Sequence, residues 1–229
     1  MFKLRNDLRA IVIALFCFIQ LCFGVSIQLT SGTMEKWLCF ISIMISALFA
    51  LCFFRKSMVG LLMVIGLLLT LCADFFLVML TPINRLTGMI FFLFVQLIYG
   101  ARLYVQERNL LKRRALLMVR AILSIIGIFL ALIVLKKQVD ALAIISVVYY
   151  INLIMNLILA FISKNLLLAI GLVLFACCDL FVGIQVMSDL YFTINENSIL
   201  HSIIFPPFNV VWAFYVPSQT LIAVSTVRK

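Results

Sequence analysis

Two aspartates stand alone inside long apolar stretches of the sequence. Asp74 follows the run LLMVIGLLLTLCA, and Asp179 follows the run LLLAIGLVLFACC. An ionisable residue near the middle of a bilayer costs about 2.5–3.5 kcal/mol on insertion scales. We therefore expect both side chains to face the interior of a helix bundle and to have a function there. Two carboxyls in a low-dielectric site can share one proton, which suits general acid and base chemistry.

The two aspartates occupy equivalent positions in an internal repeat. Residues 61–76 read LLMVIGLLLTLCADFF and residues 166–181 read LLLAIGLVLFACCDLF, with nine of 16 positions identical at an offset of 105 residues. The glycine, cysteine and aspartate matches are harder to attribute to chance than the leucine matches. Because the two stretches are separated by four predicted crossings, they should run parallel. We predict two four-helix halves related by an axis along the membrane normal.

Further polar side chains lie at comparable depth in other apolar stretches. Tyr149, Asn152 and Asn156 share one helical face, and a second stripe of the same spacing starts at Trp212. Each such residue alone is typical of a hydrogen bond between membrane helices. Together with the aspartates they predict one polar centre. Its expected substrate-binding residues are Gln96, Tyr99, Asn152, Asn156, Tyr215 and Gln219.

The composition requires helices that cross a membrane to position these residues. Hydrophobic residues make up 66% of the 229 residues and charged residues 11%, whereas a soluble domain is about half apolar and a quarter charged. These proportions argue against soluble, disordered and nucleic-acid-binding proteins, and the continuous apolar runs favour helices over a β-barrel. We predict an all-α, polytopic membrane domain over residues 1–229. Its eight predicted spans are 10–29, 37–54, 58–80, 86–105, 116–135, 140–162, 166–187 and 207–226.

The basic residues predict the orientation of the bundle. Fourteen of the 18 Lys and Arg residues fall on the side of the two termini, six of them in the region 102–120. Because basic residues concentrate in cytoplasmic loops, we expect both termini in the cytoplasm. The net charge of +10 then reflects topology and not binding to nucleic acid. The long outer connection 188–207 has no Asn-x-Ser/Thr sequon, which is compatible with a bacterial plasma membrane.

The cysteines and the single histidine do not suggest a metal site. All seven cysteines fall within apolar runs, where we interpret them as small hydrophobic residues and not as disulfides or zinc ligands. His201 lies in the connection 188–207 and is expected to be solvated. We therefore expect neither a metal nor a cofactor.

The stretches that carry the polar residues resemble the YhhN-like family. CADFFLVML and GMIFFLFVQLIYGARLY resemble the family's third and fourth spans, whose pattern Gly-x-x-x-Phe-x-x-x-His-x-x-Tyr corresponds to Gly88, Phe92, Gln96 and Tyr99. YYINLIMNLILAF and AIGLVLFACCDLFVGI resemble two later spans, and YVPSQTLIAVS resembles the final segment. The family's Gly-Asp and Ser-Asp pairs are replaced by Ala73-Asp74 and Cys178-Asp179, and Gln96 stands where the family has His.

The resemblance implies lysoplasmalogenase activity on a membrane lipid or lysolipid. The vinyl-ether bond of a lysoplasmalogen would be hydrolysed to a fatty aldehyde and a glycerophospho-base. Asp74 and Asp179 would be the catalytic pair, with the acid and base roles not assigned between them. Two alternatives stay open: a proton-coupled small-molecule transporter, and a non-catalytic lipid-binding member of the family. The second is suggested by Gln96, because glutamine cannot titrate.

Overall fold

The secondary structure is helical throughout the part of the chain that the structure describes. The computed structural model covers residues 2–54, 56–107, 109–136, 139–190, 195 and 198–227, and no strand occurs among them. Long helices follow from the apolar runs, because in lipid each backbone N–H and C=O must be paired within its own segment. The predicted all-α class is confirmed.

Most helices end close to the predicted boundaries, whereas the first, second and fifth α-helices begin eight, five and six residues before the predicted spans. Several start at a side chain that caps the first turn, as Ser57, Asn84 and Asp140 do. In chain order the elements are α1 (Phe2–Leu29), α2 (Gly32–Phe53), α3 (Met58–Asp74), the π-helical turn η1 (Phe75–Met79), α4 (Arg85–Gln106), α5 (Leu110–Leu135), α6 (Ala141–Ile162), α7 (Leu166–Leu190), α8 (Ile199–Ile204) and α9 (Val210–Val224).

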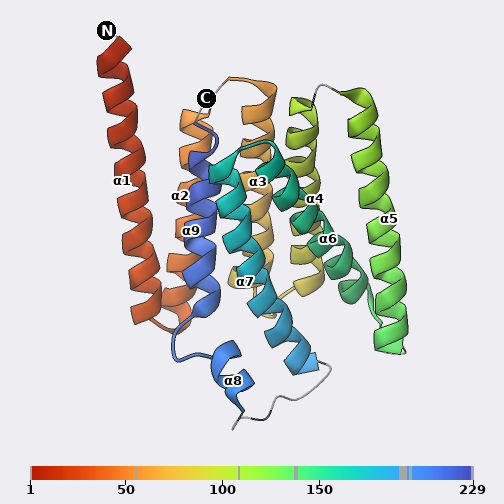
Figure 1. The fold of residues 1–229 in the computed structure, drawn as a ribbon. Helices are drawn as coiled ribbons and strands as arrows, with labels where there is room; N and C mark the ends of the chain where they lie inside the picture. The colour runs from red at the N-terminus through yellow and green to blue at the C-terminus, as the bar shows by residue number, and fades with distance from the viewer. Residues whose placement is uncertain are drawn as a thin grey trace.

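Seven described helices are long and apolar enough to cross a membrane. The eighth predicted span, 207–226, corresponds to α9, which has 15 residues and contains Pro217. At 1.5 Å per residue it is roughly 22 Å long, against about 30 Å of hydrocarbon. It nevertheless lies inside the bundle, packed against α7, α1 and α2 (Figure 1). The membrane class is supported, whereas eight crossings remain a prediction.

The helices alternate in direction, and the two termini lie at the same end of the bundle (Figure 1). α1 and α5 form the outer edges in this view, and α5 has only Arg120 and Ala131 buried. The most extensive packing joins α3 to α4 and α7 to α9. The short helix α8 lies at the end opposite to the termini, within the connection 188–207, of which residues 191–194, 196 and 197 lie outside the described residues.

The two glycines of the repeat each lie where a neighbouring helix packs closely against them. A Cβ atom on Gly66 would overlap the ring of Tyr99 on α4. A Cβ atom on Gly171 would lie 2.9 Å from Cγ1 of Ile222 and 3.3 Å from the carbonyl oxygen of Ser218, both on α9. The repeat positions therefore have the same packing role in α3 and α7. The symmetry of two four-helix halves stays a prediction.

Two of the basic residues that count toward the predicted orientation are buried inside the bundle. Arg102 on α4 and Arg120 on α5 are 3% and 7% exposed, respectively. They hold charge inside the bundle and do not mark a cytoplasmic surface. The remaining basic residues still favour the side of the termini, and the cytoplasmic orientation stays a prediction.

Candidate active site

Asp74 lies at the end of α3, where the helix changes its geometry. Its side chain is 3% exposed, and it accepts a hydrogen bond of 2.7 Å from the hydroxyl of Tyr215 on α9. The next residues form η1, in which the N–H of Leu80 donates to the carbonyl oxygen of Phe75, five residues earlier. Such π-helical turns occur frequently at functional sites. The carboxyl is therefore held by a distant helix beside an irregular turn.

Asp179 lies within α7 and is partly exposed. Its carboxyl accepts a hydrogen bond from the hydroxyl of Tyr149 on α6. Each aspartate thus has a phenolic donor from another helix, and the two carboxyls face related environments in the interior.

A chain of aromatic rings connects the two tyrosines. The Phe92 ring lies 6.0 Å from that of Tyr149 and 5.7 Å from that of Phe175, centroid to centroid. The Phe175 ring lies 5.5 Å from that of Tyr215, which in turn meets Trp212 edge to face at 5.1 Å. Aromatic faces carry partial negative charge and attract cations. The surroundings of the carboxyls can therefore stabilise a positively charged intermediate.

Three of the predicted substrate-binding residues form a network with Arg120. The guanidinium donates to Oδ1 of Asn152 at 3.0 Å and to Oδ1 of Asn156 at 2.7 Å. The Asn156 amide donates to the backbone oxygen and to Oε1 of Gln96, at 2.7 and 3.0 Å. This network joins α4, α5 and α6. Its three amides are therefore engaged in holding helices together.

Arg120 is not among the site residues predicted from the sequence, because it follows a run of basic residues that is typical of a cytoplasmic loop. A usable signal exists, since Arg120 stands six residues beyond Arg114, with the apolar stretch ALLMV between them and AILS after it. A basic residue that deep in an apolar run is expected to seek polar partners. Asn152 and Asn156 on the next helix are those partners.

The remaining predicted residues lie inside the bundle. Tyr99 is fully buried, with its ring against Gly66. Gln219 is fully buried one turn beyond Tyr215 on α9, and neither polar atom of its amide has a hydrogen-bond partner among the described residues. The same holds for Nε2 of Gln96. Buried polar atoms are normally paired, directly or through water. These amides can therefore bond to a substrate or to an ordered water molecule.

No group of three or more His, Cys, Asp or Glu side chains that could bind a metal occurs within the described ranges. His201 lies on α8, with its ring 4.9 Å from that of Phe205. The chemistry of the site, as far as it is described, is that of carboxyls, phenols and amides. A metal-free reaction stays an expectation.

Comparison with known proteins gives one match. The model of a family described as the YhhN family matches residues 36–226, which include the helices from α3 to α9 and almost all of α2. No curated protein and no solved structure matches the chain.

Proposed function

The chain belongs to the YhhN family, and on this premise we propose that it hydrolyses the vinyl-ether bond of a lysoplasmalogen. The observation that carries the proposal is the pair of contacts Asp74–Tyr215, which is buried, and Asp179–Tyr149, which is partly buried, joined by aromatic rings. Two carboxyls in a low-dielectric interior can provide one acid and one base. Vinyl-ether hydrolysis requires both.

The proposed reaction begins with transfer of a proton from one carboxyl to the β-carbon of the vinyl ether. A C–H bond forms, the C=C π bond breaks, and an oxocarbenium ion remains beside a carboxylate. The rings of Phe92 and Phe175 pack against Tyr149 and Tyr215, and aromatic faces attract such positive charge. Water then adds to the cationic carbon while a carboxylate accepts the water proton. The resulting hemiacetal separates into a fatty aldehyde and the free hydroxyl of the glycerophospho-base.

The tyrosines position the carboxyls for this reaction. Each phenol donates to one carboxyl oxygen, and each carboxyl is thereby oriented in its helix. The unpaired amide of Gln219, one turn from Tyr215, lies where it can hold the attacking water or the glycerol hydroxyl. The acid and base roles belong to Asp74 and Asp179 together.

The test is the replacement of each carboxyl by an amide of the same shape. In Asp74→Asn and Asp179→Asn, aldehyde release from lysoplasmalogen should fall by about a hundredfold or more, because a general acid or base is lost. Aldehyde is measured with a coupled reductase on purified protein in detergent. Asp140→Asn is the matched control, since Asp140 caps α6 far from the proposed reaction and asparagine caps equally well. Full activity in either site variant would contradict the two-carboxyl mechanism.

A second substrate tests whether cleavage requires the vinyl double bond or occurs at any ether bond. A lysolipid with a saturated ether has no double bond to protonate, and it should release neither aldehyde nor alcohol. Its cleavage at a rate similar to that of lysoplasmalogen would exclude the proposed protonation step.

Proton-coupled transport is favoured by one observation. Asp74, Arg102 and Arg120 are all buried in the bundle, with the polar network of Arg120 among them. Such residues are also suited to ion movement. Proteoliposomes distinguish the two functions: a transporter moves protons with its substrate and leaves lysoplasmalogen intact, whereas the enzyme releases aldehyde.

Lipid binding without catalysis is the other alternative, and it is suggested by Gln96, which cannot titrate. The amide of Gln96 is buried and partly unpaired at the position where the family pattern has His. If a titrating group is needed there, wild-type protein binds lysolipid without turnover and Gln96→His gains activity. Aldehyde release by the wild-type protein argues against this alternative.

A further inference from the structure

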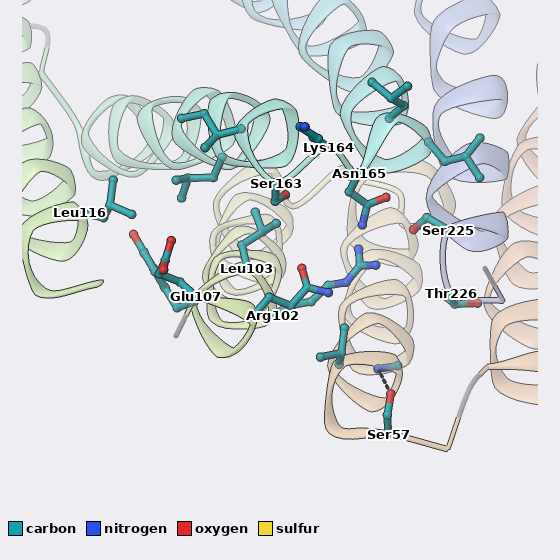
Figure 2. Close-up of a pocket in the computed structure, with 18 of the residues that line it drawn as sticks. Ser57, Arg102, Leu103, Glu107, Leu116, Ser163, Lys164, Asn165, Ser225 and Thr226 are labelled. Carbon is teal, nitrogen blue, oxygen red and sulfur yellow. Dashed lines mark hydrogen bonds between the residues drawn. The ribbon is translucent and has the colours of Figure 1, made fainter. Parts of the chain in front are cut away.

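A cavity of about 920 Å³ lies at the end of the bundle that carries both termini (Figures 1 and 2). It is lined by the first turns of α3 and α7, the last turns of α4 and α6, and the residues that follow α9. Gly60 lines it, and Asp74 is 14 residues further along the same helix. At 1.5 Å per residue the cavity is roughly 21 Å from the aspartates. It is therefore separate from the candidate active site.

Arg102 is the buried charge of this cavity. It is 3% exposed and lines the cavity with its guanidinium drawn between Ser57 and Asn165 in Figure 2. Its Nη1 donates to Sδ of Met63 at 3.1 Å, and its Nε has no hydrogen-bond partner among the described residues. A thioether sulfur is a weak acceptor. No carboxylate of the described chain pairs with this guanidinium, although a buried charge normally requires a counter-charge.

The same cavity receives the N-terminal ends of two long helices. α3 starts at Met58, with Ser57 Oγ accepting from the N–H of Gly60 at 3.2 Å, and α7 starts at Leu166. The first residues of both helices line the cavity. A helix N-terminus carries partial positive charge and unpaired N–H groups, which attract anions. The N–H groups of these first turns can donate to an anion, whereas the C-terminal ends of α4 and α6 in the same cavity carry partial negative charge. The positive charge for an anion therefore comes from Arg102 and Lys164.

Among the described residues, the side chains at the rim do not compensate that positive charge. Lys164 lies in the turn between α6 and α7 and is exposed. The acidic lining residue, Glu107, is paired with Lys112 at 2.9 Å. Arg102 and Lys164 are therefore left as net positive charge. The amide of Asn165 adds a neutral donor that points into the same region in Figure 2.

We propose that this cavity binds the phosphate group of a phosphate ester, either a phospholipid head group or a soluble ester. An arginine fork matches two phosphate oxygens, the lysine adds a second positive charge, and the N–H groups at the starts of α3 and α7 are further donors. The volume is that of a site for a small organic ligand and exceeds what a bare ion requires. The glycerol unit that joins the phosphate to the vinyl ether of a lysoplasmalogen is far shorter than the distance to Asp74. The bound ester is thus a different molecule from one reacting at the aspartates.

The experiment uses full-length protein in an uncharged detergent and two matched pairs of probes. sn-Glycerol 3-phosphate is compared with glycerol by calorimetric titration, and phosphatidate is compared with diacylglycerol of the same chains by native mass spectrometry. The phosphate-bearing member of at least one pair should bind saturably and its counterpart should not. Binding of glycerol 3-phosphate indicates a soluble ester, and binding of phosphatidate alone indicates a lipid head group.

Variants then locate the binding. Arg102→Gln should weaken it by roughly ten- to a hundredfold, the range expected for hydrogen bonds to a charged group. Lys164→Gln, at an exposed position that folding does not require, should weaken it several-fold, and Lys164→Glu should weaken it more. Lys36→Gln is the matched control, because Lys36 is exposed at the opposite end of the bundle.

Binding of the phosphate probe should not depend on the proposed catalysis at the aspartates. Asp74→Asn should bind the phosphate probe as the wild-type protein does, even if it releases no aldehyde. The proposal is overturned if neither phosphate probe binds better than its counterpart. It is also overturned if the Lys164 variants bind as the wild type does, an outcome that can be obtained even if Arg102→Gln does not fold.

Discussion

Tyr149 and Tyr215 provide the same kind of contact to two aspartates through different helices. Asp74 on α3 receives its hydrogen bond from α9, and Asp179 on α7 receives its own from α6. The repeat that relates the aspartates therefore does not extend to their donors. At the scale of single residues, the two aspartates occupy matching positions of the repeat, whereas the two tyrosines that donate to them do not.

Removal of either phenolic hydroxyl should reduce stability and activity together. Tyr215→Phe and Tyr149→Phe keep the ring contacts with Phe175 and Phe92 but lose the donor to the carboxyl. We expect a loss of about 1–2 kcal/mol in stability and a fall of roughly tenfold in aldehyde release, since 1.4 kcal/mol is a factor of ten. Thermal unfolding and the coupled aldehyde assay measure the two effects.

Tyr150→Phe is the control for these variants. Tyr150 follows Tyr149 on α6, and its hydroxyl makes no hydrogen bond to a described residue. It should leave unfolding and aldehyde release close to the wild-type values. Equal effects of all three substitutions would show that the hydroxyls at positions 149 and 215 have no special role.

The sequence identified single residues well where a polar side chain interrupts an apolar run. Asp74, Asp179 and Gln219 are conspicuous for this reason, and the structure places all three within the bundle. Arg102 and Arg120 were assigned to the cytoplasmic side because they adjoin a basic cluster. A charge count along the chain cannot show that a side chain folds back into the interior, which depends on partners such as Asn152 from another helix.

At the scale of elements, close helix packing depends on glycine at one position and not at another in the same helix. Gly171 and Gly183 both belong to α7. The first lies against Ile222 and the backbone of α9, whereas a Cβ on the second would meet nothing within 4 Å. Alanine should therefore have opposite effects at the two positions.

Gly171→Ala should destabilise the protein by about 1–3 kcal/mol, because the added methyl group forces α7 and α9 apart. Gly183→Ala should be neutral or stabilising by up to about 1 kcal/mol, because alanine restricts the unfolded chain and favours the helix. The midpoint of thermal unfolding in detergent compares the two variants directly. A similar shift for both would mean that the α7–α9 approach does not depend on this glycine.

The limits of the elements were largely predictable because charged and proline residues interrupt the apolar runs. The predicted spans 86–105, 140–162 and 166–187 agree with α4, α6 and α7 within three residues at each end. α9 is shorter than predicted because it starts only after the cap at Asn209. The π-helical turn after Asp74 had no signal in the sequence, since its residues Phe75–Met79 are as apolar as the helix before them.

At the scale of the whole molecule, the position of α9 decides how many times the chain crosses the membrane. α9 packs along α7 and leads back to the end where α1 begins (Figure 1). We therefore expect both termini on the cytoplasmic side, as the basic residues predict.

Terminal reporter fusions test this topology. A reporter that is active only in the cytoplasm should be active at both the N-terminus and the C-terminus, and an export-dependent reporter should be inactive at both. A fusion after Asn195, in the connection before α8, is the matched control and should behave in the opposite way. Termini on different sides would mean that α9 does not complete a crossing.

The hydrogen bond between Asp74 and Tyr215 also has a consequence for biosynthesis. The two residues are 141 positions apart in the chain, and ribosomes add about 5–20 residues per second, so the carboxyl precedes its donor by roughly 7–28 s. During that interval α3 must enter the bilayer with an aspartate that lacks its final partner. The run of leucines ahead of Asp74 supplies the apolar surface that lets the translocon accept the segment. The site is thus completed only when the last helix is inserted, and a nascent chain that stalls before α9 has no functional centre.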